Sequence, residues 1–193
     1  MNTSVAQDEN LTIPAEEANI TDGNYQRLKD TFLRSVGSLF GKQKNLPKLF
    51  FSVTKKLSKF FSISGALLVV HCDHDDRLKV IASKKMRHSH EGLALTLPPQ
   101  RSLIYSVFRS GRTYIENYPD NFRGNFIEQK LLLDDEAKSL VICPTIHRGL
   151  PNGLICFTSP VPYAFVMFEA GILKDITEKF GAVLNRELRF LNI

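Results

Sequence analysis

The sequence lacks an apolar run of the length that a membrane-spanning helix needs. Its longest run covers residues 65–70, whereas a helix that crosses a bilayer takes roughly 20 residues. The first 26 residues contain no lysine, no arginine and no apolar core, so neither a secretory signal nor a transit peptide is expected. We therefore expect a cytoplasmic protein without a transmembrane segment.

Cysteine is scarce, and the count of three is odd. An odd number argues against a disulfide framework, so we expect reduced thiols. The sequence also lacks a Ser-His-Asp order, a paired-carboxylate signature and a phosphate loop, and we predict no catalytic residue and no enzyme. The alternative is a thiol-based redox enzyme or redox sensor that uses Cys143 or Cys156, although buried thiols are common core residues.

Charge is distributed unevenly along the chain. Residues 1–24 carry five acids and no base, whereas residues 25–59 carry nine bases and the single acid Asp30. The acidic stretch has too few apolar residues to offset the entropy of ordering, and we predict that it is disordered. The basic stretch is either a solvated lysine face, which we favour, or a surface that contacts nucleic acid or an anionic membrane.

The hydrophobic pattern predicts an α+β domain with an antiparallel sheet. Apolar residues recur at helical spacing over 25–40, over 46–61 after Asn45 as an N-cap, and over 168–191. Ser102 can cap another helix, which ends at Gly111. A short helix is predicted over 126–133. Strands are predicted over 66–71, 78–82, 93–97, 113–115, 140–146 and 154–158, with a turn over 148–153 between the last two.

Four stretches resemble the GAF domain family, and they occur in the family's order. The last of them, residues 163–165, is similar to the family's junction before its final helix. Residues 57–66 are similar to its first helix running into its first strand. Residues 102–114 are similar to a helix that ends in a Ser-Gly turn before a strand. Residues 139–155 are similar to its hairpin with Ser-Leu at the start, Pro in the middle and two later glycines. The resemblance implies a central antiparallel β-sheet with the N- and C-terminal helices on one face and a ligand pocket on the other.

The same resemblance implies a sensory domain that acts in signal transduction and binds a small molecule between the sheet and residues 102–111 and 117–133. It implies no particular cofactor. Aromatic rings, guanidinium groups and an amide gather in this region, with the arginines suited to an anionic or carbonyl-rich ligand and Tyr114 and Phe126 suited to stacking. The alternative is a purely structural region. The candidate ligand-binding residues are Tyr105, Phe108, Arg109, Arg112, Tyr114, Asn117, Arg123 and Phe126.

Histidine and cysteine cluster in the sequence without predicting a metal site. His71 and His74 flank a predicted turn, whereas His88 lies about 11 residues beyond it, which is on the order of 35 Å along an extended strand. A single ion cannot use both ends of such a strand. We therefore expect no metal site among His71, Cys72, His74, His88 and His90, and we expect the histidines to lie on the surface or in loops.

The predicted organisation has three parts: an acidic tail over 1–24, a helix and linker over 25–45, and a GAF-like domain over 46–193 that includes a C-terminal signalling helix. After one face of the last helix covers the sheet, Ile172, Leu184, Leu188 and Leu191 remain as a second apolar stripe. The helix over 25–40 has no assigned place in the core. We therefore predict a homodimer held through the terminal helices.

Overall fold

A computed structural model describes residues 15–42, 45–85, 88–117, 122–133, 136–165 and 169–187. A six-stranded sheet in the order β3-β2-β1-β6-β5-β4 forms its centre. All neighbouring strands pair antiparallel. The strands are β1 Gly65–Cys72, β2 Arg77–Lys85, β3 His88–Thr96, β4 Tyr114–Glu116, β5 Ser139–His147 and β6 Leu150–Ser159.

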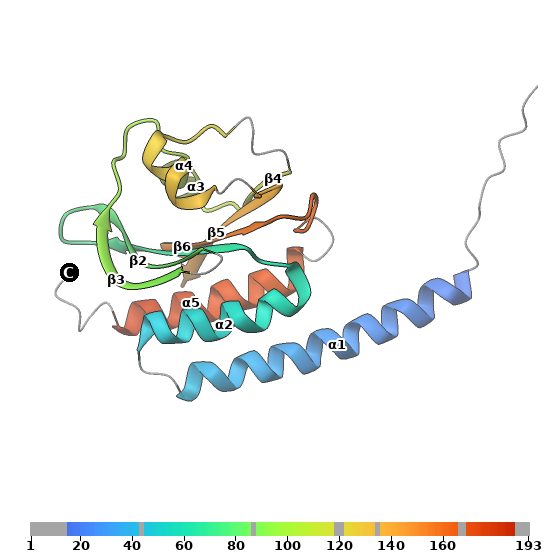
Figure 1. Cartoon of the computed structure of the whole chain (residues 1–193). Coiled ribbons are helices and arrows are strands. Elements are labelled where there is room, and N and C mark those ends of the chain that lie inside the picture. The colour runs from blue at the N-terminus through green and yellow to red at the C-terminus, as the bar shows by residue number, and fades with distance from the viewer. Residues whose placement is uncertain are drawn as a thin grey trace, which may run out of the picture.

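Helices cover both faces of this sheet (Figure 1). Two of them, α3 and α4, lie on one face, and the other three lie on the opposite face. We refer to these as the two-helix face and the three-helix face. The helices are α1 Ala15–Lys42, α2 Leu46–Phe61, α3 Leu103–Ser110, α4 Phe126–Leu132 and α5 Lys174–Glu187, which continues from the π-helical turn η2 Glu169–Leu173.

Each face has its own apolar core, because alternate residues of a strand point to opposite sides of the sheet. On β1, Leu67 and Val69 face α3 and α4, whereas Leu68 and Val70 face α2 and α5. All four side chains are buried. The α+β class and the antiparallel sheet predicted from the sequence are therefore confirmed.

The helix caps explain why α2 and α3 begin where they do. The Asn45 side chain accepts a hydrogen bond from the Lys48 amide at 2.9 Å, and Ser102 does the same for Tyr105 at 2.9 Å. Both caps satisfy an amide that has no partner inside its helix. At the end of α3, Gly111 adopts φ 62, which a residue with a side chain seldom does.

The turn between β5 and β6 is shorter than predicted. Only Arg148 and Gly149 form it, with φ values of 52 and 82, and two such residues match the twist of the strands that they join. The pairing shifts register between Thr145 and Ile146, where Ile146 pairs with Pro151. The predicted turn over 148–153 is therefore wrong, because this irregularity takes Pro151 into the strand.

The first helix is longer than predicted. It begins at Ala15 and not near residue 25, so α1 extends into the acidic stretch. Ala15, Glu16, Glu17 and Ala18 are good helix formers, which accounts for the earlier start. Residues 1–14 lie outside the described residues, and so do 188–193 of the predicted last helix.

Apolar residues expected to stay uncovered on the terminal helices are in fact buried. Phe32 and Val36 of α1 pack into the core of the three-helix face, as do Ile172 and Leu184 at the C-terminal end. The expected second stripe is therefore wrong for these residues. α1 forms an additional layer over α2 and α5 (Figure 1), and Leu184 faces β6, where its Cδ1 would lie 3.0 Å from a Cβ added to Gly153. Leu188 and Leu191 lie outside the described residues. None of the helices in the described part of the chain is both long and apolar enough to span a bilayer.

Candidate ligand site

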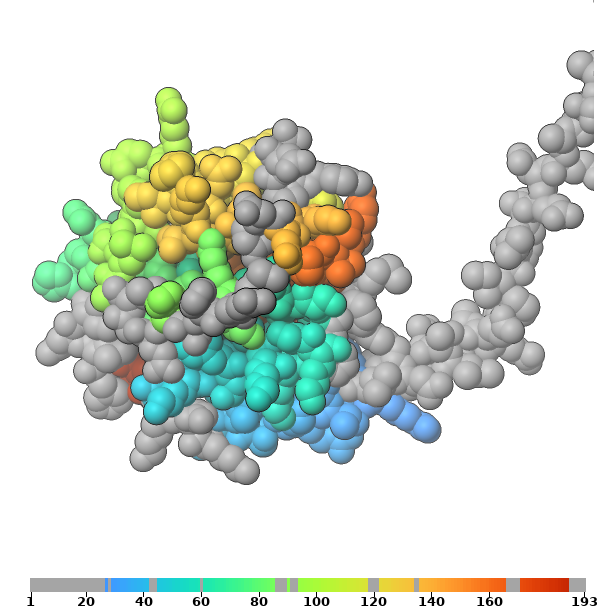
Figure 2. Space-filling model, in the orientation of Figure 1, coloured from blue at the N-terminus to red at the C-terminus, as the bar shows by residue number. Residues whose placement is uncertain are grey.

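A hollow of about 940 Å³ follows α3 and the segments beside it. We call it the α3 cavity. It is open to the surface on the two-helix face, where α3 and α4 form the yellow part of Figure 2. Its lining residues are Pro99, Arg101, Ser102, Leu103, Tyr105, Ser106, Val107, Arg109, Ser110, Arg112, Thr113, Tyr114 and Arg123.

The lining of the α3 cavity is cationic. Among the described residues, it includes four arginines and no aspartate or glutamate. Within the described ranges, none of these guanidinium groups forms an ion pair with a carboxylate. All four side chains are exposed. An anion that enters the cavity therefore meets several donors that are not already engaged with acidic groups.

Five of the eight predicted ligand residues lie together in this cavity: Tyr105, Arg109, Arg112, Tyr114 and Arg123. They come from α3, from the turn after it, from β4 and from the segment before α4. The Arg109 guanidinium carbon lies 5.9 Å from the centre of the Tyr105 ring, a cation–π contact.

Three predicted ligand residues lie elsewhere. The Phe108 ring stacks on His71, with centroids 4.8 Å apart. Phe126 is 70% exposed, and the ammonium group of Lys130 lies 5.5 Å from its ring centre. Asn117 is partly buried beyond the end of β4, and its Oδ1 has no hydrogen-bond partner. None of the three is among the lining residues of the α3 cavity.

The space between the sheet and α3 is filled with side chains. Ile104 and Leu132 are buried there against strand residues such as Ile142 and Leu154. The chain's own apolar core therefore occupies the volume directly beneath α3. The hollow lies instead along the open side of α3.

A fully buried carboxylate, that of Glu128, ties α4 to the beginning of α3. It accepts hydrogen bonds from the Leu103 amide at 2.9 Å, from the Ile104 amide at 3.2 Å and from the Ser102 hydroxyl. It also accepts one from the Asn125 amide at 3.2 Å and so completes a capping box of α4. The sequence analysis missed Glu128, although Asn125 three residues before it is the signature of this motif.

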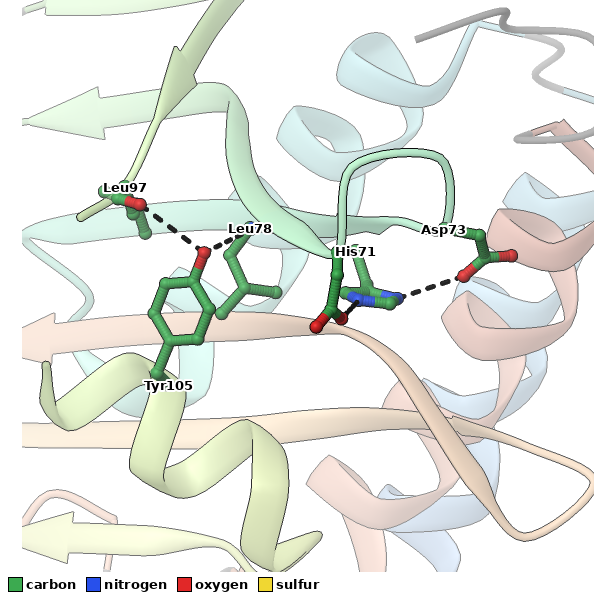
Figure 3. A network of polar contacts seen from close by, with 6 residues as sticks. His71, Asp73, Leu78, Leu97 and Tyr105 are labelled. Atoms are coloured by element: carbon green, nitrogen blue, oxygen red, sulfur yellow. Dashed lines mark hydrogen bonds and ion pairs between the residues drawn. The ribbon is translucent and has the colours of Figure 1, made fainter. Parts of the chain in front are cut away.

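The Tyr105 hydroxyl fixes the position of α3 over the sheet (Figure 3). It accepts a hydrogen bond from the Leu78 amide at 2.9 Å and donates one to the Leu97 carbonyl at 3.4 Å. At the other end of the cavity, the Tyr114 hydroxyl donates to Glu116 at 2.9 Å. Burial raises the pKa of Tyr114, the Glu116 carboxylate adds to this effect, and the nearby Arg123 opposes it.

All three thiols are buried. Burial raises the pKa of Cys143 to about 12 and raises that of Cys156 as well. These two residues face opposite sides of the sheet, Cys143 towards α5 and Cys156 towards α3. A reactive cysteine needs an exposed, cationic setting that favours its thiolate, and neither site provides one.

His71, near the first hairpin, contacts two acids of its turn. His71 lies 3.1 Å from Asp73 and 2.8 Å from Asp76, and Figure 3 shows it beside this turn. His74 is exposed in the turn itself, and His90 lies on β3. Within the described part of the chain, no three His, Cys, Asp or Glu side chains lie together as ligands of a metal would.

The basic surface of α2 lies away from the α3 cavity. Lys48, Lys55 and Lys59 are exposed, whereas the Lys56 ammonium group donates to the Ser35 carbonyl at 3.0 Å. The apolar side of the helix, including Leu49 and Val53, is buried against the sheet. The α2 lysines therefore form the solvent-facing side of a packed helix.

No protein-family model and no curated protein sequence matches the chain. Solved structures do match. The GAF domain of an Acinetobacter phosphoenolpyruvate-protein phosphotransferase has a TM-score of 0.69 at 14% identity, covering 86% of this chain and 98% of that one. The corresponding domain from Coxiella burnetii gives 0.68 at 13%, with 86% and 97% covered. A free methionine-R-sulfoxide reductase from Neisseria meningitidis gives 0.64 at 13%, with 86% and 93% covered. The chain has the GAF fold.

Proposed function

We propose that this protein is a non-enzymatic, cytoplasmic sensory or regulatory module that binds a small molecule in the α3 cavity. The observation that carries the proposal is the gathering of Tyr105, Arg109, Arg112, Tyr114 and Arg123 around one hollow. Its volume of about 940 Å³ lies within the usual range of ligand pockets. The GAF fold also occurs in a sensor histidine kinase and in a chemotaxis protein, which supports a signalling role.

A change at α3 on ligand binding would be transmitted to α5 through β5 and β6, because these two strands contact the helices of both faces. On the two-helix face, Ile104 and Val107 of α3 pack in the same core as Ile142 and Leu154. On the other face, Asn152 of β6 donates to the Gly181 carbonyl of α5 at 2.7 Å. A Cβ added to Gly181 would lie 2.2 Å from the Ile146 carbonyl oxygen, so α5 sits directly on β5. A shift of α3 against these strands would therefore reach the C-terminal helix.

Native mass spectrometry and thermal shift test the ligand site. We expect freshly purified protein to carry a retained small molecule, or to be stabilised by at least one compound of a broad nucleotide and metabolite panel. Replacing Arg112 with Ala should cost about 1.5–3 kcal/mol of ligand affinity, because a charge-assisted hydrogen bond is lost. Lys55→Ala, on the opposite face, is the matched control and should bind like the parent. No retained mass and no stabilised melt with any compound would refute the site.

We also propose that the protein forms a homodimer held through its terminal helices. A groove of about 620 Å³ runs between α1 and α5, with Leu33, Gly37 and Ala182 in its lining. Arg34 and Lys179 supply two positive charges there, and Asp175 and Glu178 supply two negative ones. A two-fold interface must be complementary to itself, and a patch with equal numbers of both signs meets this requirement.

Light scattering at tens of micromolar tests the dimer. We expect the mass of two chains for the parent, and the mass of one chain for Ala182→Arg, because the new side chain fills the groove. Ala182 is exposed, so this variant should fold. Lys48→Ala, outside the groove, should leave the dimer intact. A parent protein with the mass of one chain would contradict this part of the proposal and leave the ligand site unaffected.

A further inference from the structure

We infer that the α3 cavity takes a small molecule with at least two anionic groups, phosphate or carboxylate, held by arginines at both ends of α3. This inference rests on the proposed function and specifies the ligand class of the same site. It starts from the charge of the lining, to which the described residues contribute four guanidinium groups and no carboxylate. Guanidinium groups match the planar, two-point geometry of phosphate and carboxylate oxygens.

The arginines are divided between the two ends of the cavity. Arg101 precedes the N-cap of α3, whereas Arg109 lies in the last turn and Arg112 follows the C-cap. The eight residues of α3 span about 12 Å at a rise of 1.5 Å per residue, and Arg101 and Arg112 lie beyond its opposite ends. Arg123 lies at the second end, since its charge acts on Tyr114. A ligand with two separated anionic groups can therefore engage the arginines of both ends at once.

The backbone amides at the start of α3 are not available to such a ligand. Glu128 already accepts hydrogen bonds from the Leu103 and Ile104 amides and from the Ser102 hydroxyl. The anionic groups of a ligand must therefore be bound by side chains. This restriction distinguishes the α3 cavity from a phosphate site built on a helix N-terminus.

One of the cationic groups is positioned before a ligand arrives. The Arg109 guanidinium lies over the Tyr105 ring, and the Tyr105 hydroxyl is held by β2 and by the segment after β3. Arg101 follows Gln100 in the turn before α3 with φ 50, a left-handed conformation that is uncommon outside glycine. Ser106 and Ser110, whose side chains are exposed, add neutral hydroxyl groups between the two ends.

Calorimetric titration with small anionic probes tests the inference. Tripolyphosphate and citrate carry several anionic groups, and orthophosphate carries one. We expect tripolyphosphate or citrate to bind at least tenfold more tightly than orthophosphate, and which of the two is preferred separates phosphate from carboxylate recognition. Binding should weaken as salt is raised from 50 to 300 mM, because the site is open to solvent.

Variants at the two ends make the test specific. Arg101→Ala and Arg112→Ala should each weaken binding of the preferred polyanion at least fivefold, while their melting temperatures stay at the parental value. The control Lys48→Ala,Lys55→Ala removes two charges from α2 and should change the affinity less than twofold. Equal loss in the control, equal affinity for orthophosphate, or no polyanion binding would overturn the inference.

The results of these experiments distinguish a failure of this inference from a failure of the proposed function. If native mass spectrometry finds an uncharged ligand while no polyanion binds, the ligand class is wrong and the sensory role stands. If polyanions bind at both ends of α3 but binding leaves α5 and the oligomeric state unchanged, the ligand class stands and the proposed signalling role is wrong. Hydrogen exchange of α5 with and without tripolyphosphate provides that second measurement.

Discussion

The two faces of the sheet are held to it in different ways. On the three-helix face, aromatic contacts dominate: Phe50 lies 6.5 Å from Phe157 and 6.3 Å from Phe180 between ring centres, and Phe61 stacks on Phe165. On the two-helix face, polar groups add directional contacts to the apolar core. There, Glu128 holds the start of α3, and the Lys85 ammonium group donates to the Leu133 carbonyl at 3.0 Å.

This difference matters because apolar contacts and hydrogen bonds constrain structure differently. Apolar burial stabilises in proportion to area and tolerates small shifts. A buried hydrogen bond depends on distance and angle, and it fixes the position of the groups that it joins. The three-helix face therefore supplies most of the stability, whereas the two-helix face sets the position of α3, along which the α3 cavity lies.

Removing an aromatic ring from the three-helix face should give the largest loss of stability. Phe180 is fully buried and contacts both Phe40 and Phe50. We expect Phe180→Ala to lower the free energy of unfolding by about 3–5 kcal/mol, through lost burial and the cavity left behind. Urea denaturation measures it. Glu178→Ala, exposed on the same helix, should change the value by less than about 0.5 kcal/mol.

Removing the buried carboxylate of the two-helix face should give the next largest loss. Glu128→Ala leaves the Leu103 and Ile104 amides and the Ser102 hydroxyl without their acceptor. We expect a loss of about 2–4 kcal/mol in urea denaturation, because unsatisfied buried donors are costly. Gln129→Ala, exposed one position further along α4, is the control. A Glu128→Ala variant as stable as this control would contradict the distinction between the two faces.

Much of the three-helix face could be predicted from the sequence. The helical spacing from Leu46 to Phe61 and the Asn45 cap define α2, because one local pattern contains both the apolar stripe and its start. The alternating strands likewise lead to the antiparallel sheet. What local patterns could not show was that α1 packs over α2 and α5, since the burial of Phe32 and Val36 depends on residues more than 100 positions away.

The candidate site was only partly predictable. Arg109 in the last turn of α3 and Arg112 just after its C-cap both line the cavity. Residues so near in the sequence also lie near in space, so a local pattern suffices to bring them together. Phe126 was not, because the start of α4 points it to solvent. The role of Glu128 depends on the contact of α4 with α3 across 25 residues, which no local pattern contains.

Deleting one hydroxyl from the two-helix face should have a smaller effect. Tyr105→Phe keeps the ring under Arg109 and removes the hydrogen bonds to the Leu78 amide and the Leu97 carbonyl. We expect a loss of about 1 kcal/mol in unfolding free energy, the usual net value of a buried hydrogen bond. Polyanion affinity should fall as well, because α3 is less firmly positioned. An unchanged melt would show that apolar packing alone positions α3.

The smallest effect on stability is expected from the buried cysteines, of which Cys143 lies on the three-helix face and Cys156 on the two-helix face. Burial raises the pKa of Cys143 from 9.0 to about 12, so the folded protein keeps this proton while the unfolded chain loses it above about pH 9. The thiol's contribution to stability is therefore fully present below pH 9 and is lost as the pH rises towards 12.

At pH 8, labelling of native protein by a thiol reagent should be slow for both Cys143 and Cys156. Two variants extend this test: one retains only Cys143, the other retains only Cys156, and the remaining cysteines are changed to Ala. Both thiols should become reactive at the same urea concentration, because both faces share strands β5 and β6. Earlier labelling of Cys156 would show that the two-helix face opens by itself, and fast labelling of native protein at pH 8 would favour thiol chemistry over the regulatory role.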